Sequence, residues 1–136
     1  MTSAVDVLVQ KFGGTSLRTL DHVRRAAVRI SAARSRGRAV AVVVSARGSR
    51  TDDLLRLAAD VGAAGPSREL DQLLAVGESE SAALMALALN GAGVPAVSLT
   101  GHQAGIRGTD RHGDALISSI GAARVRSALS GGQVAV

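Results

Sequence analysis

Apolar and polar residues alternate in blocks that predict strands and helices in turn. Apolar, β-branched runs indicate strands at residues 5–10, 39–45, 95–100 and 133–136. Apolar residues at helical spacing indicate helices at residues 20–37, 51–58, 68–92 and 114–129. The order strand–helix–strand–helix–helix–strand–helix–strand predicts an α/β fold of three layers, in which helices cover both faces of a mostly parallel sheet.

Individual residues mark the ends and interruptions of these elements. Thr19 is expected to cap the first helix, and Gly37 to end it. Residues 62–66 contain glycine and proline and should separate the second helix from the third. Gly77 predicts a kink in the third helical region, or its division into two helices. Residues 101–113 are polar and contain glycine, so we expect a loop there.

Composition narrows the class of protein. A chain of 136 residues suits one domain or one lobe of a larger domain. It has no cysteine, which excludes disulfides, thiolate metal sites and a cysteine nucleophile. Residues 1–9 lack the basic start and long apolar stretch of a signal peptide, and no stretch has the roughly 18 uninterrupted apolar residues of a membrane span. We therefore expect a cytoplasmic protein that does not bind a membrane.

The net charge of +5 raises the question of nucleic-acid binding. Single-strand binding needs aromatic side chains on which bases stack, and the chain has one aromatic residue. Its basic residues are also scattered, so we expect no nucleic-acid partner. All of the sixteen basic residues except Lys11 are arginines. Because ammonium and guanidinium groups are not interchangeable, this exception indicates a position that requires lysine.

Lys11 opens the segment KFGGTS at residues 11–16, between the first strand and the first helix. The two glycines allow the backbone N–H groups of the turn to approach a ligand closely. Amides near a helix N-terminus favour anions, and an adjacent ammonium neutralises charge on a phosphoryl group. The lysine precedes the glycines, so the segment is not a Walker loop. The alternative is an ordinary tight turn.

Five segments in order resemble aspartate kinases, members of the amino acid kinase superfamily. They cover nearly the whole chain: KFGGTS at 11–16, VVSA with TDDL at 43–54, RELDQLL with GE at 68–78, SAAL at 81–84, and SLTGHQAGI at 98–106. The resemblance implies the amino acid kinase (carbamate kinase-like) fold. It also implies phosphorylation of the β-carboxylate of L-aspartate by ATP with Mg²⁺, the first step towards lysine, threonine and methionine.

The resemblance also assigns roles to individual residues. Lys11 would stabilise charge on the transferred phosphate, and Gly13 and Gly14 would offer their backbone N–H groups to the same oxygens. Ser45 and Thr51 match positions that contact aspartate, although Ser45 could simply end a strand and Thr51 could cap a helix.

On the substrate side, Thr15 and Ser16 would add hydroxyl groups. Glu78 matches the carboxylate that holds the α-ammonium group of aspartate by a charge-assisted hydrogen bond; its alternative is a surface acid. Glu80 departs from the resemblance, because the family usually has an apolar residue there. The histidines show no metal-ligand pattern, so no protein-bound metal site is expected.

The segment that supplies the nucleotide pocket in aspartate kinases has no counterpart here. Residues 1–136 are therefore expected to be the N-terminal, substrate-side lobe of a truncated kinase domain, without the nucleotide-binding lobe or regulatory domains. Such a chain would be inactive alone and would meet ATP only when the missing lobe is supplied. A homo-oligomer is compatible with the resemblance. The alternatives are a non-catalytic module that binds an amino acid or a partner chain, and a basic nucleic-acid binder that shares the fold.

Overall fold

The computed structural model describes residues 6–136 and contains a sheet of four parallel strands in the order β1–β2–β6–β3. Strands β1 (Val7–Phe12) and β2 (Ala39–Val44) pair in register along their whole lengths, from Val7 opposite Ala39 to Phe12 opposite Val44. Strands β3 (Ala96–Val97) and β6 (Val134–Ala135) are short. These elements confirm the predicted parallel sheet. The start predicted for the first strand, at Val5, lies outside the described residues.

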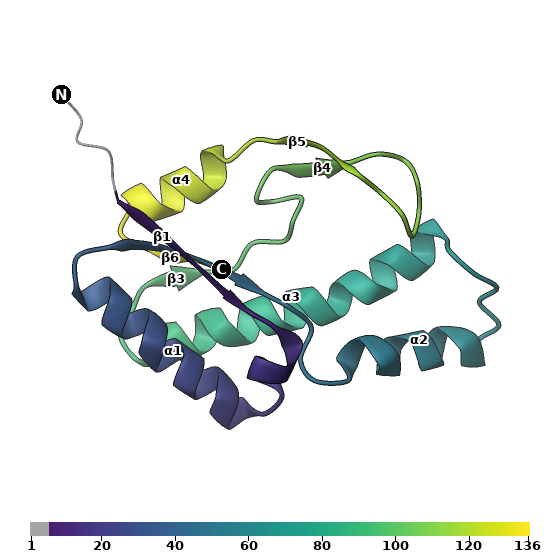
Figure 1. The fold of residues 1–136 in the computed structure, drawn as a ribbon, viewed down its shortest axis with the longest axis horizontal. Helices are drawn as coiled ribbons and strands as arrows, with labels where there is room; N and C mark the ends of the chain where they lie inside the picture. The colour runs from purple at the N-terminus through teal and green to yellow at the C-terminus, as the bar shows by residue number, and fades with distance from the viewer. Residues whose placement is uncertain (1–5) are drawn as a thin grey trace.

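Helices lie on both faces of this sheet (Figure 1). Helices α1 (Leu20–Ser35) and α3 (Arg68–Gly91) cover one face, where Val40 and Val42 of β2 are buried in the main core. Helix α4 (Ala123–Ser130) lies on the opposite face, against β2 and β6. The predicted three-layer α/β architecture is therefore confirmed.

The first helix begins as expected. The Thr19 hydroxyl accepts a hydrogen bond from the backbone N–H of His22 at 3.2 Å, and the His22 ring lies 2.8 Å from the same oxygen. This pairing satisfies amide groups that the first turn of a helix leaves free. Helix α1 ends at Ser35, just before Gly37, whose φ of 80° is the left-handed value that glycine adopts easily.

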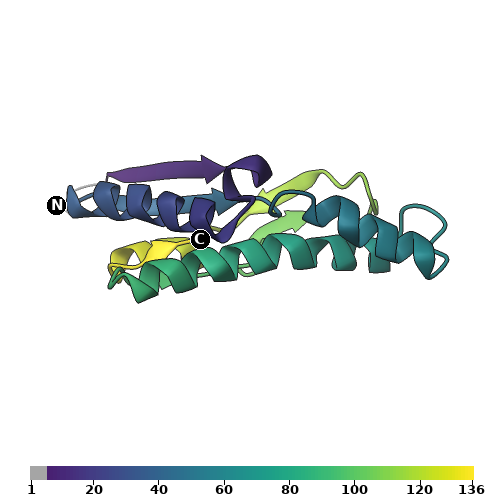
Figure 2. The same ribbon diagram turned by 90° about the horizontal axis from the view of Figure 1, so that it is seen from below.

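Helices α2 (Arg50–Asp60) and α3 pack side by side beyond the edge of the sheet, and α3 runs along most of the molecule (Figure 2). Helix α3 is long and apolar enough to span a membrane by length and composition. It packs against α1, α2 and the sheet, and buries Met85 and Leu89 completely. We therefore regard it as the core helix of a folded domain.

The predicted division into two helices at Gly77 is wrong, because α3 is a single helix. Gly77 is buried, and a Cβ atom at this position would lie 3.1 Å from Ala46 Cβ and 3.3 Å from Leu54 Cδ1. The absence of a side chain thus allows α3 to pack closely against α2 and the turn before it. Close packing, and not an interruption of the helix, explains this glycine.

The predicted helix at residues 114–129 is wrong in its first half. Strand β5 (Ile117–Ile120) pairs antiparallel with β4 (Ile106–Gly108), and only residues from Ala123 onward are helical. At the base of this hairpin, Gly121 N–H donates to the Gly105 carbonyl at 2.8 Å. A Cβ atom at Gly105 would lie only 2.0 Å from the Gly121 oxygen. The two glycines therefore allow the chain to close a hairpin where the spacing of apolar residues suggested a helix.

We predict that Gly77→Leu lowers the free energy of unfolding by about 1–3 kcal/mol, because the side chain would overpack the contact with Ala46 and Leu54. Gly91→Ala is the control, since it lies in the same helix and a Cβ there would meet nothing within 4 Å. It should change stability by no more than about 1 kcal/mol. Urea denaturation followed by circular dichroism measures both effects. Equal stability of Gly77→Leu and the unmodified chain would contradict the packing role.

Candidate active site

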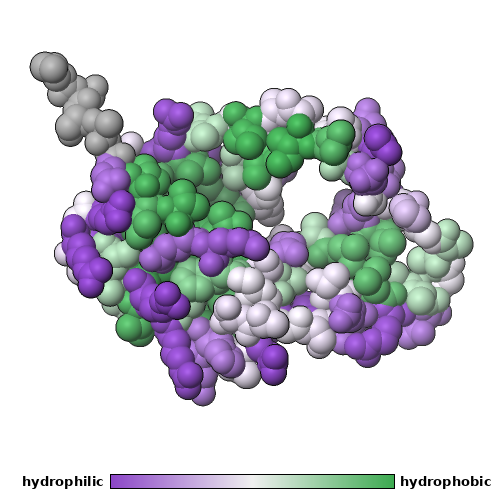
Figure 3. Space-filling model, in the orientation of Figure 1, coloured by the Kyte–Doolittle hydropathy of each residue, from purple (hydrophilic) through white to green (hydrophobic). Residues whose placement is uncertain are grey.

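A cavity of about 970 Å³ lies between the open face of the sheet, the β4–β5 hairpin, α3 and α4. Its walls are mainly apolar and include Val9, Val43, Ile106, Ile120 and Val125. The polar side chains at its border are Glu78, Ser79, Thr100 and His102. The surface view shows apolar groups over the strands and the hairpin, with a hollow between the hairpin and α3 (Figure 3). An apolar cavity with a few polar groups is typical of a small-molecule site.

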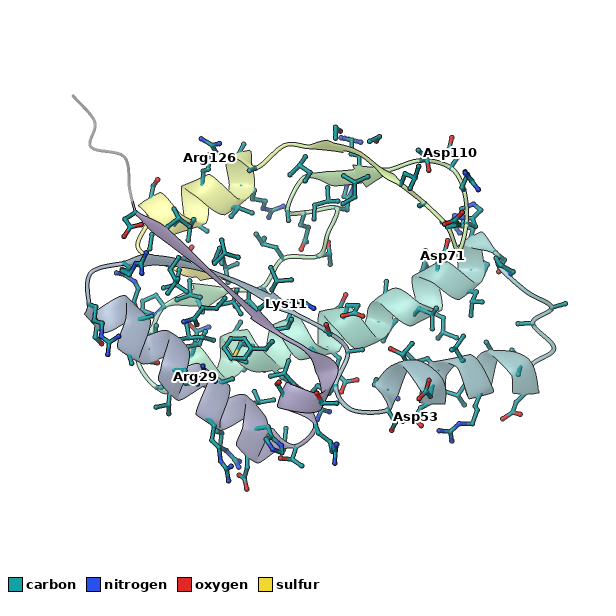
Figure 4. All side chains as sticks on the ribbon, viewed as in Figure 1. Lys11, Arg29, Asp53, Asp71, Asp110 and Arg126 are labelled. Carbon is teal, nitrogen blue, oxygen red and sulfur yellow. The ribbon has the colours of Figure 1, made fainter. Side chains whose placement is uncertain are left out.

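Lys11 lies on the side of the sheet that faces this cavity. It is directly opposite Val43 in the β1–β2 register. Because side chains alternate along a strand, Lys11 shares a face with Val9, and both Val9 and Val43 line the cavity. The side chain is exposed and extends from β1 over the middle of the molecule (Figure 4). No ion pair involves it among residues 6–136. The ammonium group is therefore available to an anion.

The glycine turn after β1 packs against the turn after β2. Gly13 precedes a short 3-10 helix, η1 (Gly14–Leu17), and the Gly14 carbonyl accepts a hydrogen bond from Gly48 N–H at 2.9 Å. A Cβ atom at Gly14 would lie 2.5 Å from the Ala46 oxygen, so a larger residue would force the two turns apart. Gly14 is therefore required for the packing of the two turns, independently of any contact between its amide and a ligand.

Ser45 and Thr51 belong to the segment after β2. Ser45 is half-buried, and its backbone N–H donates to the Phe12 carbonyl at 3.2 Å, which places it at the same sheet edge as the glycine turn. Thr51 is an exposed residue in the first turn of α2. The cap position of this helix is Ser49, so the alternative in which Thr51 caps the helix is wrong.

Glu78 is an exposed residue of α3 at the border of the cavity. It is next to Gly77, which contacts Ala46, and Ala46 is next to Ser45. The fold thus brings Glu78, from a helix, close to the segment that follows β2. Lys11 and Ser45 lie at the ends of β1 and β2, and the backbone next to Glu78 packs beside the segment that contains Ser45.

The structure does not bring Thr15 and Ser16 to the border of the large cavity. Both are exposed on η1, and Ser16 lines a second cleft of about 520 Å³ between β1 and α1. This cleft also contains Lys11, His22, Arg25 and Arg29. Among the predicted site residues, Ser16 and Lys11 thus share a different opening from the one lined by Glu78.

Glu80 forms an ion-pair cluster that sequence reasoning missed. One carboxylate oxygen lies 2.7 Å from Arg47 Nη2 and the other 3.0 Å from Arg50 Nε. The hydrogen bond from Arg47, with the charges of Arg50 and Arg47, holds the pKa of the Glu80 carboxyl below its ordinary value, and partial burial opposes this shift. The only sign of this ion-pair cluster in the sequence was that Glu80 is charged, where an apolar residue was expected.

A second contact that the sequence did not reveal holds the hairpin in place. The Asp71 carboxylate accepts hydrogen bonds from Gly113 N–H at 3.1 and 3.2 Å and lies 3.1 Å from His112 Nδ1. Asp71 is in the first turn of α3, and Gly113 is in the loop between β4 and β5. This contact fixes the far end of the hairpin that forms one wall of the cavity.

Comparisons with known proteins identify the family of the chain. Residues 6–136 match the model of the amino acid kinase family. The chain belongs to this family. It is 46% identical over 130 residues to the aspartokinase of Corynebacterium glutamicum and 48% identical over 128 residues to that of Mycobacterium tuberculosis. These matches cover 96% and 94% of this chain but only 31% and 30% of the two relatives.

Solved members of the family share the fold. The aspartate kinase of Synechocystis superposes with a TM-score of 0.79 at 39% identity, over 96% of this chain and 21% of that chain. E. coli aspartokinase III, solved with aspartate and ADP, superposes with a TM-score of 0.78 at 23% identity, over 96% of this chain and 40% of that chain. The sheet and its helices are therefore those of the amino acid kinase fold.

Within residues 6–136, no group of three or more His, Cys, Asp or Glu side chains is arranged to hold a metal ion. Mg²⁺ commonly reaches kinase sites bound to the phosphates of the nucleotide, with one or two protein carboxylates. The exposed ammonium of Lys11 suits those phosphates.

We predict that Glu80→Gln is destabilising at neutral pH and that the difference shrinks in acid. Because the folded-state pKa is lowered, the stabilisation is complete above the ordinary pKa of a glutamate carboxyl and is lost as pH falls through the lower folded-state value. Urea denaturation between about pH 7 and pH 3 measures the difference. Glu69→Gln, which alters an exposed pair with Arg68, is the control and should show little difference at either pH. A constant effect of Glu80→Gln across this range would contradict the assignment.

Proposed function

We propose that the chain is the aspartate-side lobe of an aspartokinase, which transfers the γ-phosphoryl group of ATP to the β-carboxylate of L-aspartate. The observation that carries the proposal is that Lys11 shares a sheet face with Val9 and Val43, which line the large cavity, and that Glu78 lies at the border of the same cavity. Parallel α/β sheets commonly bind ligands at this edge. The similarity to aspartokinases over nearly the whole chain supports the same assignment.

Lys11 is proposed to stabilise charge on the phosphoryl group during transfer. Phosphoryl transfer depends mainly on positioning and on electrostatic stabilisation. An exposed ammonium that has no carboxylate partner among residues 6–136 suits both tasks. The amides of Gly13 and Gly14 would donate to the same oxygens. ATP would bring Mg²⁺, which supplies further neutralisation of the phosphate charge when bound.

The segment after β2 and helix α3 are proposed to hold aspartate. Glu78 would accept hydrogen bonds from the α-ammonium group, and Ser45 and Thr51 would contact the substrate with their hydroxyl groups. Ser16 shares with Lys11 the cleft between β1 and α1, away from the large cavity. Thr15 and Ser16 are therefore proposed to contact the phosphoryl group and not the amino-acid part of the substrate.

The chain spans about 31% of the length of the relatives it matches, so residues 1–136 are proposed to act together with a nucleotide-binding lobe. The product would enter the synthesis of lysine, threonine and methionine, and the cytoplasm is the proposed location. A second candidate function is a non-catalytic module that binds an amino acid or a partner chain. The exposed apolar side chains of Val9, Val43 and Ile120 on the open face favour this alternative.

A chimera tests the kinase proposal. The chain replaces the aligned 130 residues of the Corynebacterium glutamicum relative, and hydroxylamine traps the acyl phosphate that forms from aspartate and ATP. We expect turnover by the chimera and only background from the isolated chain. A folded chimera without turnover would contradict the proposal, and so would turnover by the isolated chain.

In the same chimera, Lys11→Met should lower kcat by at least about 100-fold, because an electrostatic contact to the transition state is lost. Lys11→Arg should not restore activity, since a planar guanidinium does not replace a compact ammonium. Arg126→Met, which removes an exposed cation of α4, is the control and should leave kcat unchanged. Full activity of Lys11→Met would exclude the proposed role.

Glu78→Gln should raise KM for aspartate by about tenfold or more and leave KM for ATP unchanged, because the lost charge faces only the amino-acid substrate. Glu69→Gln, an exposed carboxylate of the same helix, is the matched control. Steady-state kinetics with each substrate varied separately distinguish the two effects. An equal rise in both KM values would argue against a specific contact with aspartate.

A further inference from the structure

The Glu80 cluster joins α3 to both ends of one tight turn. Arg47 and Arg50 are the first and last residues of this turn, and Arg50 N–H donates to the Arg47 carbonyl at 2.9 Å. Each arginine contacts a different oxygen of the same carboxylate. The side chains of Glu80, Arg47 and Arg50 are 29%, 22% and 36% exposed, so this contact is better shielded from water than the exposed pairs on the helices. We call residues 47–50 the arginine turn.

The arginine turn lies directly between residues proposed to bind substrate. Ser45 precedes it and Thr51 follows it. On its other side, Gly48 N–H donates to the Gly14 carbonyl, so the turn is also attached to the proposed phosphate-binding glycines. Gly48 has a φ of 53° and packs against Arg18, which fixes its backbone in the left-handed region. Movement of the turn would therefore displace residues on both sides of the site.

One carboxylate balances two guanidinium groups in this cluster. Among the described residues, Arg47 and Arg50 have no other carboxylate partner. Removal of the charge on Glu80 would leave two like charges close together at a partly shielded site, which costs more than the loss of one exposed pair. The turn would then relieve the repulsion by moving away from α3.

We propose that Glu80 is a positioning residue: through Arg47 and Arg50 it holds the arginine turn against α3, so that Ser45 and Thr51 face the same aspartate molecule as Glu78. This inference rests on the proposed function for its substrate. Glu80 does not line the large cavity, whose border includes Glu78 and Ser79. It acts on the substrate only through the turn.

Hydrogen exchange of the 136-residue chain tests the contact without any ligand. In Glu80→Gln, the backbone amides of residues 45–51 should exchange about tenfold faster or more, a larger increase than for the buried part of α3 around Met85, where exchange follows only the loss of global stability. Arg50→Gln retains the Arg47 contact and should give a smaller increase. Glu69→Gln should give none. Unchanged exchange at residues 45–51 in Glu80→Gln, or an equal increase throughout the chain, would overturn the inference.

A triple variant provides a rescue test and covers the case in which Glu80→Gln fails to fold. Glu80→Leu combined with Arg47→Met and Arg50→Leu replaces the ion pairs by apolar contacts, a change that buried ion clusters often tolerate. Because it holds the turn by a different interaction, it should restore slow exchange at residues 45–51. Fast exchange in a folded triple variant would show that apolar contacts do not replace the ion pairs, so that the turn depends on the charges of Glu80, Arg47 and Arg50.

The effect of Glu80 on the binding of substrate is measured as KM for aspartate in the chimera described above. Glu80→Gln should raise it about tenfold with little effect on KM for ATP, and the triple variant should reverse most of this rise. If the chimera with unmodified Glu80 has no turnover, the proposed function fails, and the exchange result still decides whether Glu80 holds the turn. If exchange accelerates but KM for aspartate is unchanged, the contact only stabilises the fold and the inference is wrong.

Discussion

The parallel pairing of β1 with β2 is the constraint on which the rest of this structure depends. It runs in register from Val7 to Phe12, so the two strands end at the same edge of the sheet. The turns that follow them must then meet, and they do so through the hydrogen bond from Gly48 to Gly14. Lys11 and Ser45, which are far apart in the sequence, come to the same edge of the sheet for this reason.

Unequal covering of the two sheet faces produces the cavity. Helices α1 and α3 bury one face completely around Val40 and Val42, whereas α4 covers only part of the other. The hairpin, attached to α3 by Asp71, closes the open side and leaves a space with apolar walls. A charged substrate in such a space would interact strongly with the few polar groups at its border, because apolar walls screen charge poorly.

Charge is arranged differently on the two sides of α3. Glu78 is exposed at the cavity and has no arginine partner among the described residues, while Glu80, two residues later, is neutralised by two guanidinium groups. The Glu78 carboxylate is thus accessible to a ligand, whereas the Glu80 carboxylate stabilises the fold. Arginine, with its planar set of donors, suits the fixed contact, and the only lysine of the chain is left at the site proposed for phosphate.

The sequence by itself determined the parallel α/β class and the cap at Thr19 and suggested the candidate site residues, because strand and helix periodicity and short motifs are local properties. The predictions made from the sequence were wrong at Gly77 and in the segment before α4, because both features depend on residues distant along the chain. Gly77 packs against Ala46 and Leu54, and the hairpin is closed by the contact between Gly105 and Gly121. The pairing of Glu80 with two arginines about thirty positions away was equally hidden. Only the tertiary structure decided these features, since packing distance and charge pairing across a fold leave no periodic pattern in a single sequence.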